Sequence, residues 1–255
     1  MTPPGAVAAA ERAGQRLPVV LVHGYLGGAA QWREQVTFLS GRFRVITIDL
    51  PGFGHATHQP ALGSIGAFAQ HVIATLDALE VERFILLGHS MGGMIAQDVA
   101  RRIPAQVDRL VLYGTGPLGR MPDRFEPLEV SISRLEDDGL PRTAHRIVAT
   151  WFIDGDRHPG FEMLRRLGVT ASPEAARAAL SAMSGWDGRA HLSALQMPVL
   201  ILWGDHDRSY RWPQVETLWR EIPNAMLGVV PGASHAAHVE KPHLFNALLA
   251  DFFTP

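Results

Sequence analysis

The stretch FILLGHSMGGMIAQDVARRIP, residues 84–104, decides the fold of this chain. An apolar run typical of a buried strand ends at GHSMG, and a helical pattern that Pro104 closes follows at once. A plain turn needs one glycine at most, whereas here Gly88 and Gly92 flank a serine. We infer a strained reversal that projects the Ser90 hydroxyl from the sheet, at a point where side chains at 88 and 92 would collide with the adjoining strand and helix.

Similar apolar runs recur along the chain, and each ends in Gly, Asp or Ser. Helical patterns separate them, as in 64–80, where Ser64 is a candidate N-cap. This alternation predicts an α/β fold with a doubly wound, mostly parallel sheet, whose ligands gather at the carboxyl ends of the strands. The predicted strands are 17–24, 43–52, 83–90, 109–116, 198–205 and 225–232, and the predicted helices are 28–40, 64–80, 91–104 and 242–253.

A long helical stretch interrupts the alternation after the fourth predicted strand. A connection of about eighty residues is an inserted element rather than a loop. We therefore expect a helical cap at 117–194 over the carboxyl edge of the sheet, with a core formed by 17–116 and 195–255. Residues 1–16 are expected to be a flexible N-terminus without a strand. That leaves one sheet edge to be covered differently or paired with another subunit, so a homo-oligomer is possible.

The composition excludes several classes of protein. The chain has 255 residues, 47% of them hydrophobic, and a formal net charge of -2, so we expect no nucleic-acid partner and no anionic membrane surface. It has no cysteine, which removes thiol nucleophiles and zinc–thiolate sites. No run approaches the roughly eighteen apolar residues of a membrane span, and the first residues do not form a signal-peptide pattern. We expect a cytoplasmic protein.

A serine hydroxyl becomes an effective nucleophile when a base removes its proton and an acid orients that base. Two later strand ends offer such groups, in the order serine, acid, histidine. GDHDR (204–208) offers Asp205 and Asp207, and GASHAAHVEKP (232–242) offers His235 and His238. The spacing by itself leaves the choice within each pair open. No metal is expected, because H-x-x-H is not the helical spacing of zinc proteases.

Five stretches, taken in order, resemble the signatures of the α/β-hydrolase fold superfamily over essentially the whole chain after residue 17. They are HGYLGG (23–28), DLPGFGHA (49–56), GHSMGG (88–93), WGDHDR (203–208) and PGASHAAHVEKP (231–242). The chain is most similar to the enol-lactonase, aryl-esterase and meta-cleavage-product hydrolase branches. The resemblance implies Ser90 as nucleophile, Asp207 as acid and His235 as base. It also implies an oxyanion hole made by the backbone N–H groups of Tyr25 and Met91, and no cofactor.

The predicted function is hydrolysis of a small or medium carboxylic ester or lactone through an acyl-serine intermediate. Two alternatives stay open: a C–C bond hydrolase of vinylogous diketones, which uses the same triad, and a ligand receptor with weak or no turnover. His89 stands where the C–C hydrolases often have asparagine, which weakens the first alternative. The candidate residues of the substrate pocket are Tyr25, Trp151, Phe152, Trp186 and His238. Arg120, Arg124, Arg134 and Arg146 could pair with a substrate carboxylate, although solvated surface arginines are commoner.

Overall fold

The computed structural model describes residues 8–10 and 17–254, and a sheet of seven strands crosses this part of the chain in the order β1-β3-β2-β4-β5-β6-β7. Every neighbouring pair is parallel except β1–β3. The strands are β1 (Ala8–Ala10), β2 (Val19–Val22), β3 (Val45–Ile48), β4 (Phe84–His89), β5 (Val107–Tyr113), β6 (Val199–Gly204) and β7 (Ala225–Val230). The predicted doubly wound, mostly parallel sheet is confirmed, and each of the six predicted strands is present.

Strand β1 was not predicted. It pairs antiparallel with β3, with Ala8 opposite Thr47 and Ala10 opposite Val45. Three alanines carry neither the β-branched residues nor the alternation that mark a strand, and the pairing rests on backbone hydrogen bonds that any side chain permits. The expected strandless N-terminus is therefore wrong at residues 8–10. The rest of that expectation, at 1–7 and 11–16, lies outside the described residues.

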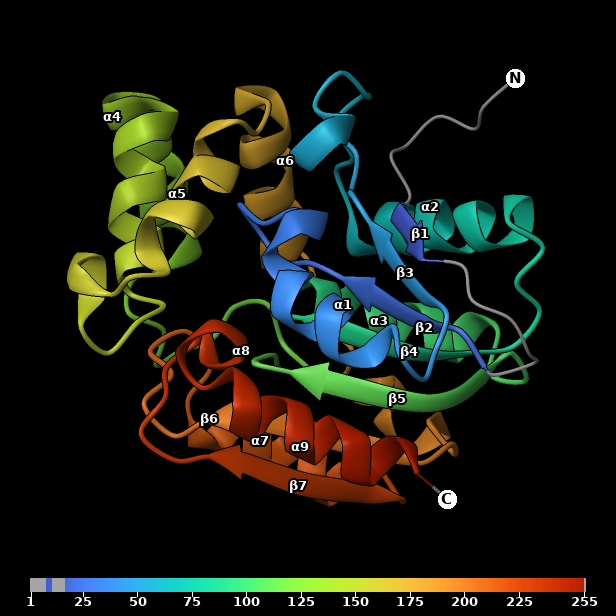
Figure 1. Ribbon diagram of the computed structural model, residues 1–255. Helices are drawn as coiled ribbons and strands as arrows, with labels where there is room; N and C mark the ends of the chain where they lie inside the picture. The colour runs from blue at the N-terminus through green and yellow to red at the C-terminus, as the bar shows by residue number, and fades with distance from the viewer. Residues whose placement is uncertain (1–7, 11–16, 255) are drawn as a thin grey trace.

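Helices cover both faces of the sheet (Figure 1). Side chains of α2 (Ile65–Ala78), α3 (Met91–Arg102) and α7 (Trp212–Glu221) belong to the same buried cluster as Val20 and Val22 of β2. The opposite face carries Val19 and Leu21, and there α9 (Pro242–Phe253) packs together with Leu39 of α1 (Arg33–Leu39). Alternate residues of one strand thus enter two different cores, which explains why the strands are apolar throughout. The remaining short helices of the core are η1 (Ala29–Trp32), η2 (Gly54–Ala56) and α8 (Ala237–Glu240).

Helix α2 begins where its capping residue predicts. The Ser64 side chain accepts a hydrogen bond from the Ala67 N–H at 3.1 Å, which satisfies one of the amides left free at a helix start. The apolar residues at helical spacing are all buried: Ile65, Phe68, Val72 and Leu76. They place α2 against α3 and so support the helix that follows the GHSMG turn.

Between β5 and β6 the chain forms helices, turns and an isolated antiparallel β-bridge between Leu118 and Asp187. The helices are α4 (Leu128–Ala149), η3 (Gly155–Arg157), α5 (Phe161–Val169), α6 (Pro173–Ser184) and η4 (Arg189–Ala194). Helix α4 is kinked at Gly139, which has a φ of 73° and precedes Pro141. The Gly119 N–H donates to Trp186 O at 2.9 Å, so the start and end of this insertion lie together. Figure 1 shows α4, α5 and α6 grouped beyond the arrowheads of β2 and β5. No helix in the described ranges is long and apolar enough to cross a membrane.

Candidate active site

Ser90 joins β4 to α3 in a strained conformation. Its φ of 58° and ψ of −120° lie in a region that residues with a side chain rarely adopt, at a cost of about 1–3 kcal/mol. Two hydrogen bonds hold it there: the Ser90 N–H donates to Tyr113 O at 2.9 Å, and Thr115 Oγ1 donates to Ser90 O at 2.7 Å. Both partners belong to β5 or the loop after it, so the neighbouring strand fixes the serine.

The two glycines around Ser90 are required by close approach. A Cβ at Gly88 would lie 2.1 Å from Gly92 O, and a Cβ at Gly92 would lie 2.4 Å from Val22 O. Real Cβ atoms do not come so near to backbone atoms. The predicted collision with the adjoining helix and strand is therefore confirmed.

The serine lies where the strand order reverses. The chain passes from β2 to β3 on one side and then returns to β4 on the other side of β2. In open α/β sheets, ligands bind at the carboxyl ends of the strands beside such a reversal. Ser90 ends β4 and Tyr25 follows β2, so these two residues flank that point.

The loops after β6 and β7 bring an acid and an imidazole together. Asp207 Oδ2 lies 2.7 Å from His235 Nδ1, and each residue is 1% exposed. Asp207 Oδ1 accepts the backbone N–H groups of Ser209 at 2.7 Å and Tyr210 at 3.1 Å. A carboxylate only accepts, so Nδ1 of His235 carries the proton and Nε2 is left as the basic nitrogen.

The two alternative residues have other partners. Asp205 Oδ1 accepts the Gly232 N–H at 2.7 Å and so holds the turn that leads to His235. The His238 Nδ1 lies 3.1 Å from the Tyr113 hydroxyl. Of the four residues, the structure therefore places Asp207 beside His235, and their roles as acid and base stay a prediction.

Aromatic contacts link the serine to the imidazole. The Tyr210 ring stacks on the His235 ring with centroids 5.6 Å apart, and the His89 ring lies 4.5 Å from His235. The Ser90 side chain lies close enough to Tyr210 to affect the pKa of that phenol. Within the described residues, Ser90 Oγ makes no hydrogen bond to His235. Such bonds are often long before substrate binds.

Two backbone amides beside Ser90 have no acceptor. A Cβ at Gly24 would lie 2.8 Å from Ser90 Cβ and 3.3 Å from Ser90 Oγ, which places the Gly24–Tyr25 peptide against the serine. Within the described part of the chain, neither the Tyr25 N–H nor the Met91 N–H donates a hydrogen bond. Both residues are buried, and Met91 is the first residue of α3. Free amides at a helix start favour an anionic oxygen.

His23 fixes the direction of the Tyr25 amide. Its Nε2 accepts the Leu50 N–H at 3.0 Å, so its Nδ1 carries the proton and donates to Gly24 O at 2.8 Å. The carbonyl of Gly24 and the N–H of Tyr25 belong to one planar peptide and point in opposite directions. By holding the first, His23 orients the second.

A network that was not predicted holds the backbone of His235. The Tyr113 hydroxyl donates to His235 O at 2.6 Å, and His89 Nε2 lies 3.1 Å from the same oxygen. The side-chain nitrogen of Gln31 lies 3.2 Å from His89 Nδ1 and can only donate, so His89 Nε2 carries a proton and donates to His235 O. The histidine beside the nucleophile was the only signal for this network in the sequence.

The structure places two of the five candidate pocket residues at the site and the other three elsewhere. Trp151 has its ring 5.7 Å from His235, and Tyr25 lies beside Ser90. Phe152 instead stacks on His158 within the insertion, and Trp186 is half-buried at its end. His238 does not line the site, because its ring is enclosed by Trp32, His89, Tyr113 and Phe245. No three His, Cys, Asp or Glu side chains in the described ranges are grouped as metal ligands.

Acidification below pH 6.5 is expected to destabilise the fold. Burial lowers the pKa of His23 and of His89, and it lowers the pKa of His238 to about 3. Below pH 6.5 the unfolded chain therefore binds more protons than the native chain. The contribution of these histidines to the free energy of unfolding is complete above pH 6.5. Below that pH it falls by up to about 1.4 kcal/mol per pH unit for each histidine. Urea unfolding at pH 7.5, 6.5 and 5.5 measures the slope.

Replacing His238 with asparagine tests the contribution of this one histidine to the pH dependence of stability. Tyr113 already donates its proton to His235 O, so His238 Nδ1–H donates to the Tyr113 oxygen, and an asparagine amide can do the same. Between pH 6.5 and 5.5, the slope of the free energy of unfolding against pH should fall by an amount that corresponds to about one proton fewer taken up on unfolding. His58→Asn, at an exposed position, is the control for the removal of a histidine side chain. An unchanged slope in His238→Asn would contradict the assignment.

Comparison with known proteins agrees with this geometry. Residues 19–248 match the model of the alpha/beta hydrolase family. A 2-hydroxy-6-oxononadienedioate/2-hydroxy-6-oxononatrienedioate hydrolase of a Pseudomonas species is 30% identical over 92% of this chain and 87% of its own. A pimeloyl-(acyl-carrier protein) methyl ester esterase of Edwardsiella ictaluri is 29% identical over 94% of both chains. The solved enol-lactonase of Burkholderia xenovorans is 25% identical, with a TM-score of 0.89 over 98% of this chain and 96% of that one. The chain belongs to the alpha/beta hydrolase family.

Proposed function

We propose that this protein is a serine hydrolase that cleaves a small or medium carboxylic ester or lactone through an acyl-Ser90 intermediate. The observation that carries the proposal is the strained Ser90 at the strand reversal, beside the buried His235–Asp207 pair. Strain of this kind is retained where the surrounding structure holds a reactive group in place. Acyl transfer also needs donors for the oxyanion of the tetrahedral intermediate, and the two free amides of Tyr25 and Met91 supply them.

The first half-reaction acylates the serine. Ser90 Oγ forms a bond to the substrate carbonyl carbon while His235 Nε2 takes the hydroxyl proton. Asp207 accepts the hydrogen bond from Nδ1 and stabilises the charged imidazolium. The carbonyl oxygen becomes an oxyanion, which the Tyr25 and Met91 amides bind. The bond to the leaving oxygen then breaks, and His235 returns its proton to that oxygen.

The second half-reaction releases the acid. His235 removes a proton from water, the hydroxide attacks the acyl carbon, and the proton returns to Ser90 Oγ as the acid leaves. For a lactone the leaving hydroxyl stays attached to the acyl group, so one hydroxy acid is released. Both half-reactions thus need only the substrate, water and the groups of this chain.

The test is turnover of p-nitrophenyl esters from acetate to octanoate, together with a set of lactones. We expect turnover above the buffer rate, and a burst of p-nitrophenol for those esters whose acyl-enzyme is hydrolysed more slowly than it forms. Intact-mass measurement after acid quench should show one acyl group per chain, located on the peptide that contains Ser90. Absence of both turnover and acyl adduct would contradict the proposal.

A C–C hydrolase is the second candidate, because a relative at 30% identity is named as a hydrolase of a dienedioate. Loss of absorbance of a vinylogous diketone acid is the matching assay. Turnover of that substrate without any ester turnover would replace the proposal with C–C cleavage. Tight binding of either substrate without turnover would favour a ligand receptor.

A further inference from the structure

A buried ionic cluster lies at the start of the insertion. Glu126 is 9% exposed, and its Oε1 accepts hydrogen bonds from Arg146 Nη1 and Ser131 Oγ, each at 2.5 Å. Arg124 Nη1 donates to the Glu126 backbone oxygen at 2.7 Å and to Ser131 Oγ at 3.0 Å. Arg134, which is half-exposed, approaches the same carboxylate at 3.4 Å. One carboxylate thus faces two arginines that are largely withdrawn from water, and the cluster has an excess of positive charge.

Several donors around this cluster have no acceptor. In the part of the chain that the structure describes, Nε and Nη2 of Arg146 are buried without a hydrogen-bond partner, and so are the hydroxyls of Tyr25 and Tyr210. Tyr25 is 4% exposed and Tyr210 is 1% exposed. Burying a donor without a partner costs the hydrogen bonds that it makes with water, so such groups are rarely left together. Four unpartnered atoms of this kind point to an acceptor that the free chain does not supply.

The cluster is connected to the catalytic residues of the proposed function. The Phe125 N–H, next to Arg124, donates to Arg208 O at 3.0 Å, which ties the cluster to the loop that carries Asp207. Tyr210 lies on that loop and is influenced by both Ser90 and Arg124: burial raises the pKa of its phenol, and these two neighbours lower it. The Tyr210 hydroxyl is therefore near Ser90, and the charge of Arg124 reaches it.

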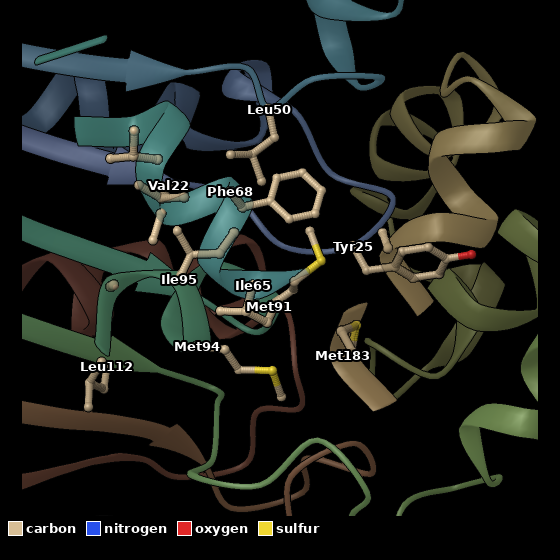
Figure 2. Close-up of a cluster of buried hydrophobic side chains, with 14 of the residues drawn as sticks. Val22, Tyr25, Leu50, Ile65, Phe68, Met91, Met94, Ile95, Leu112 and Met183 are labelled. Atoms are coloured by element: carbon tan, nitrogen blue, oxygen red, sulfur yellow. The ribbon is translucent and has the colours of Figure 1, made fainter. Parts of the chain in front are cut away.

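Tyr25 reaches the cluster from the other side of the site. Its backbone amide lies against Ser90, while Figure 2 shows its side chain extending away from the sheet, with the hydroxyl directed toward the ribbons of the insertion. Burial raises the pKa of Tyr25, and the charges of Arg124 and Arg146 oppose this effect. The charge of Arg124 thus reaches the hydroxyls of both Tyr25 and Tyr210, two residues that lie close to Ser90.

We propose that Arg124, Arg146 and the hydroxyls of Tyr25 and Tyr210 bind a free carboxylate of the substrate, so that the preferred esters or lactones are those of acids with a second, ionised carboxyl group. A carboxylate only accepts hydrogen bonds, and its two oxygens can take several donors at once, including the parallel donors of a guanidinium. Its negative charge offsets part of the excess positive charge that Arg124, Arg134 and Arg146 leave beside Glu126. This inference rests on the proposed hydrolase function and narrows its substrate class.

The test compares an anionic substrate with its neutral isostere. Monomethyl esters of dicarboxylic acids from succinate to suberate are set against the corresponding methyl esters whose free carboxyl is a carboxamide, and proton release or methanol is measured. We expect kcat/KM to be about 10- to 100-fold higher for the carboxylate at the best chain length, mainly through KM. Equal values at every chain length would overturn the proposal.

Variants locate the effect. Arg146→Gln should lower the ratio of carboxylate to carboxamide kcat/KM about tenfold or more. Arg146→Gln combined with Glu126→Gln leaves the net charge of the cluster unchanged but removes the Arg146 guanidinium. It should lower the ratio in the same way, which covers the case in which the single variant folds poorly. Arg177→Gln is the matched control, because Arg177 lies in the same insertion and its side chain pairs, among the described residues, only with Glu136 at 2.7 Å. A ratio that falls equally in Arg177→Gln would contradict the site.

A binding measurement separates this inference from the hydrolase proposal. In Ser90→Ala, which cannot form an acyl-enzyme, monomethyl adipate should raise the melting temperature and the carboxamide analogue should not. A selective rise with no esterase turnover in the wild type would retain the carboxylate site and reject the function. Ester turnover without the selective rise would retain the function and reject the site.

Discussion

Replacing Ser90 with alanine is expected to lower kcat for p-nitrophenyl acetate by about 10⁵- to 10⁶-fold, to the level that oxyanion binding alone sustains. The reason is that in the proposed function Ser90 Oγ forms the bond to the acyl carbon, a step that the methyl group of alanine cannot perform. Backbone strain at φ 58° is the same for alanine as for serine, so the melting temperature should be unchanged within about 2 °C. Steady-state kinetics and a thermal melt measure the two quantities.

Ser64→Ala is the matched control for Ser90→Ala. Ser64 caps α2 through the Ala67 N–H, so its loss should lower the free energy of unfolding by about 0.5–2 kcal/mol. Its kcat should stay at the wild-type value, because α2 supplies no residue to the site. If Ser64→Ala loses stability but keeps its activity, then reduced stability does not explain the activity that Ser90→Ala loses. More than a tenth of wild-type activity in Ser90→Ala would reject Ser90 as the nucleophile.

The parts of this fold that could be predicted are those whose physical cause is local in the sequence. Gly88, Ser90 and Gly92 are adjacent, and the need for glycine beside a strained residue can be inferred from them alone. The N-cap of α2 is local in the same way. By contrast, β1 rests on backbone pairing with β3 and leaves no trace in three alanines.

The residues that could not be predicted act across long separations. His89, Tyr113 and His235 meet only because β4, β5 and β7 end at one edge of the sheet, and the hydrogen bonds to His235 O depend on that meeting. Trp151 and Phe152 are neighbours in sequence, yet one faces His235 and the other His158. Periodicity cannot distinguish them, because the turn after α4 sets their directions.

Asp207→Asn is expected to lower kcat by about 10⁴-fold, for a reason that the hydrogen bonds define. Asp207 Oδ1 accepts two backbone N–H groups, so the amide oxygen of asparagine will keep that position and its NH₂ group will face His235. An NH₂ group donates, and His235 Nδ1 must then accept. The imidazole proton moves to Nε2, the nitrogen that should take the proton of Ser90. The base is therefore lost although the site keeps its shape, and kcat on p-nitrophenyl acetate measures this loss.

Asp205→Asn distinguishes this effect from the loss of any carboxylate near the site. Asp205 Oδ1 accepts the Gly232 N–H, and an asparagine oxygen can accept the same bond, so kcat should change by less than about threefold. Both variants remove one negative charge from the loop after β6, two residues apart. Only the variant at 207 reverses the direction of a hydrogen bond to the imidazole. Wild-type activity in Asp207→Asn, with a large loss in Asp205→Asn, would assign the acid to Asp205 and would require His235 to turn away from the partner that it has in this structure.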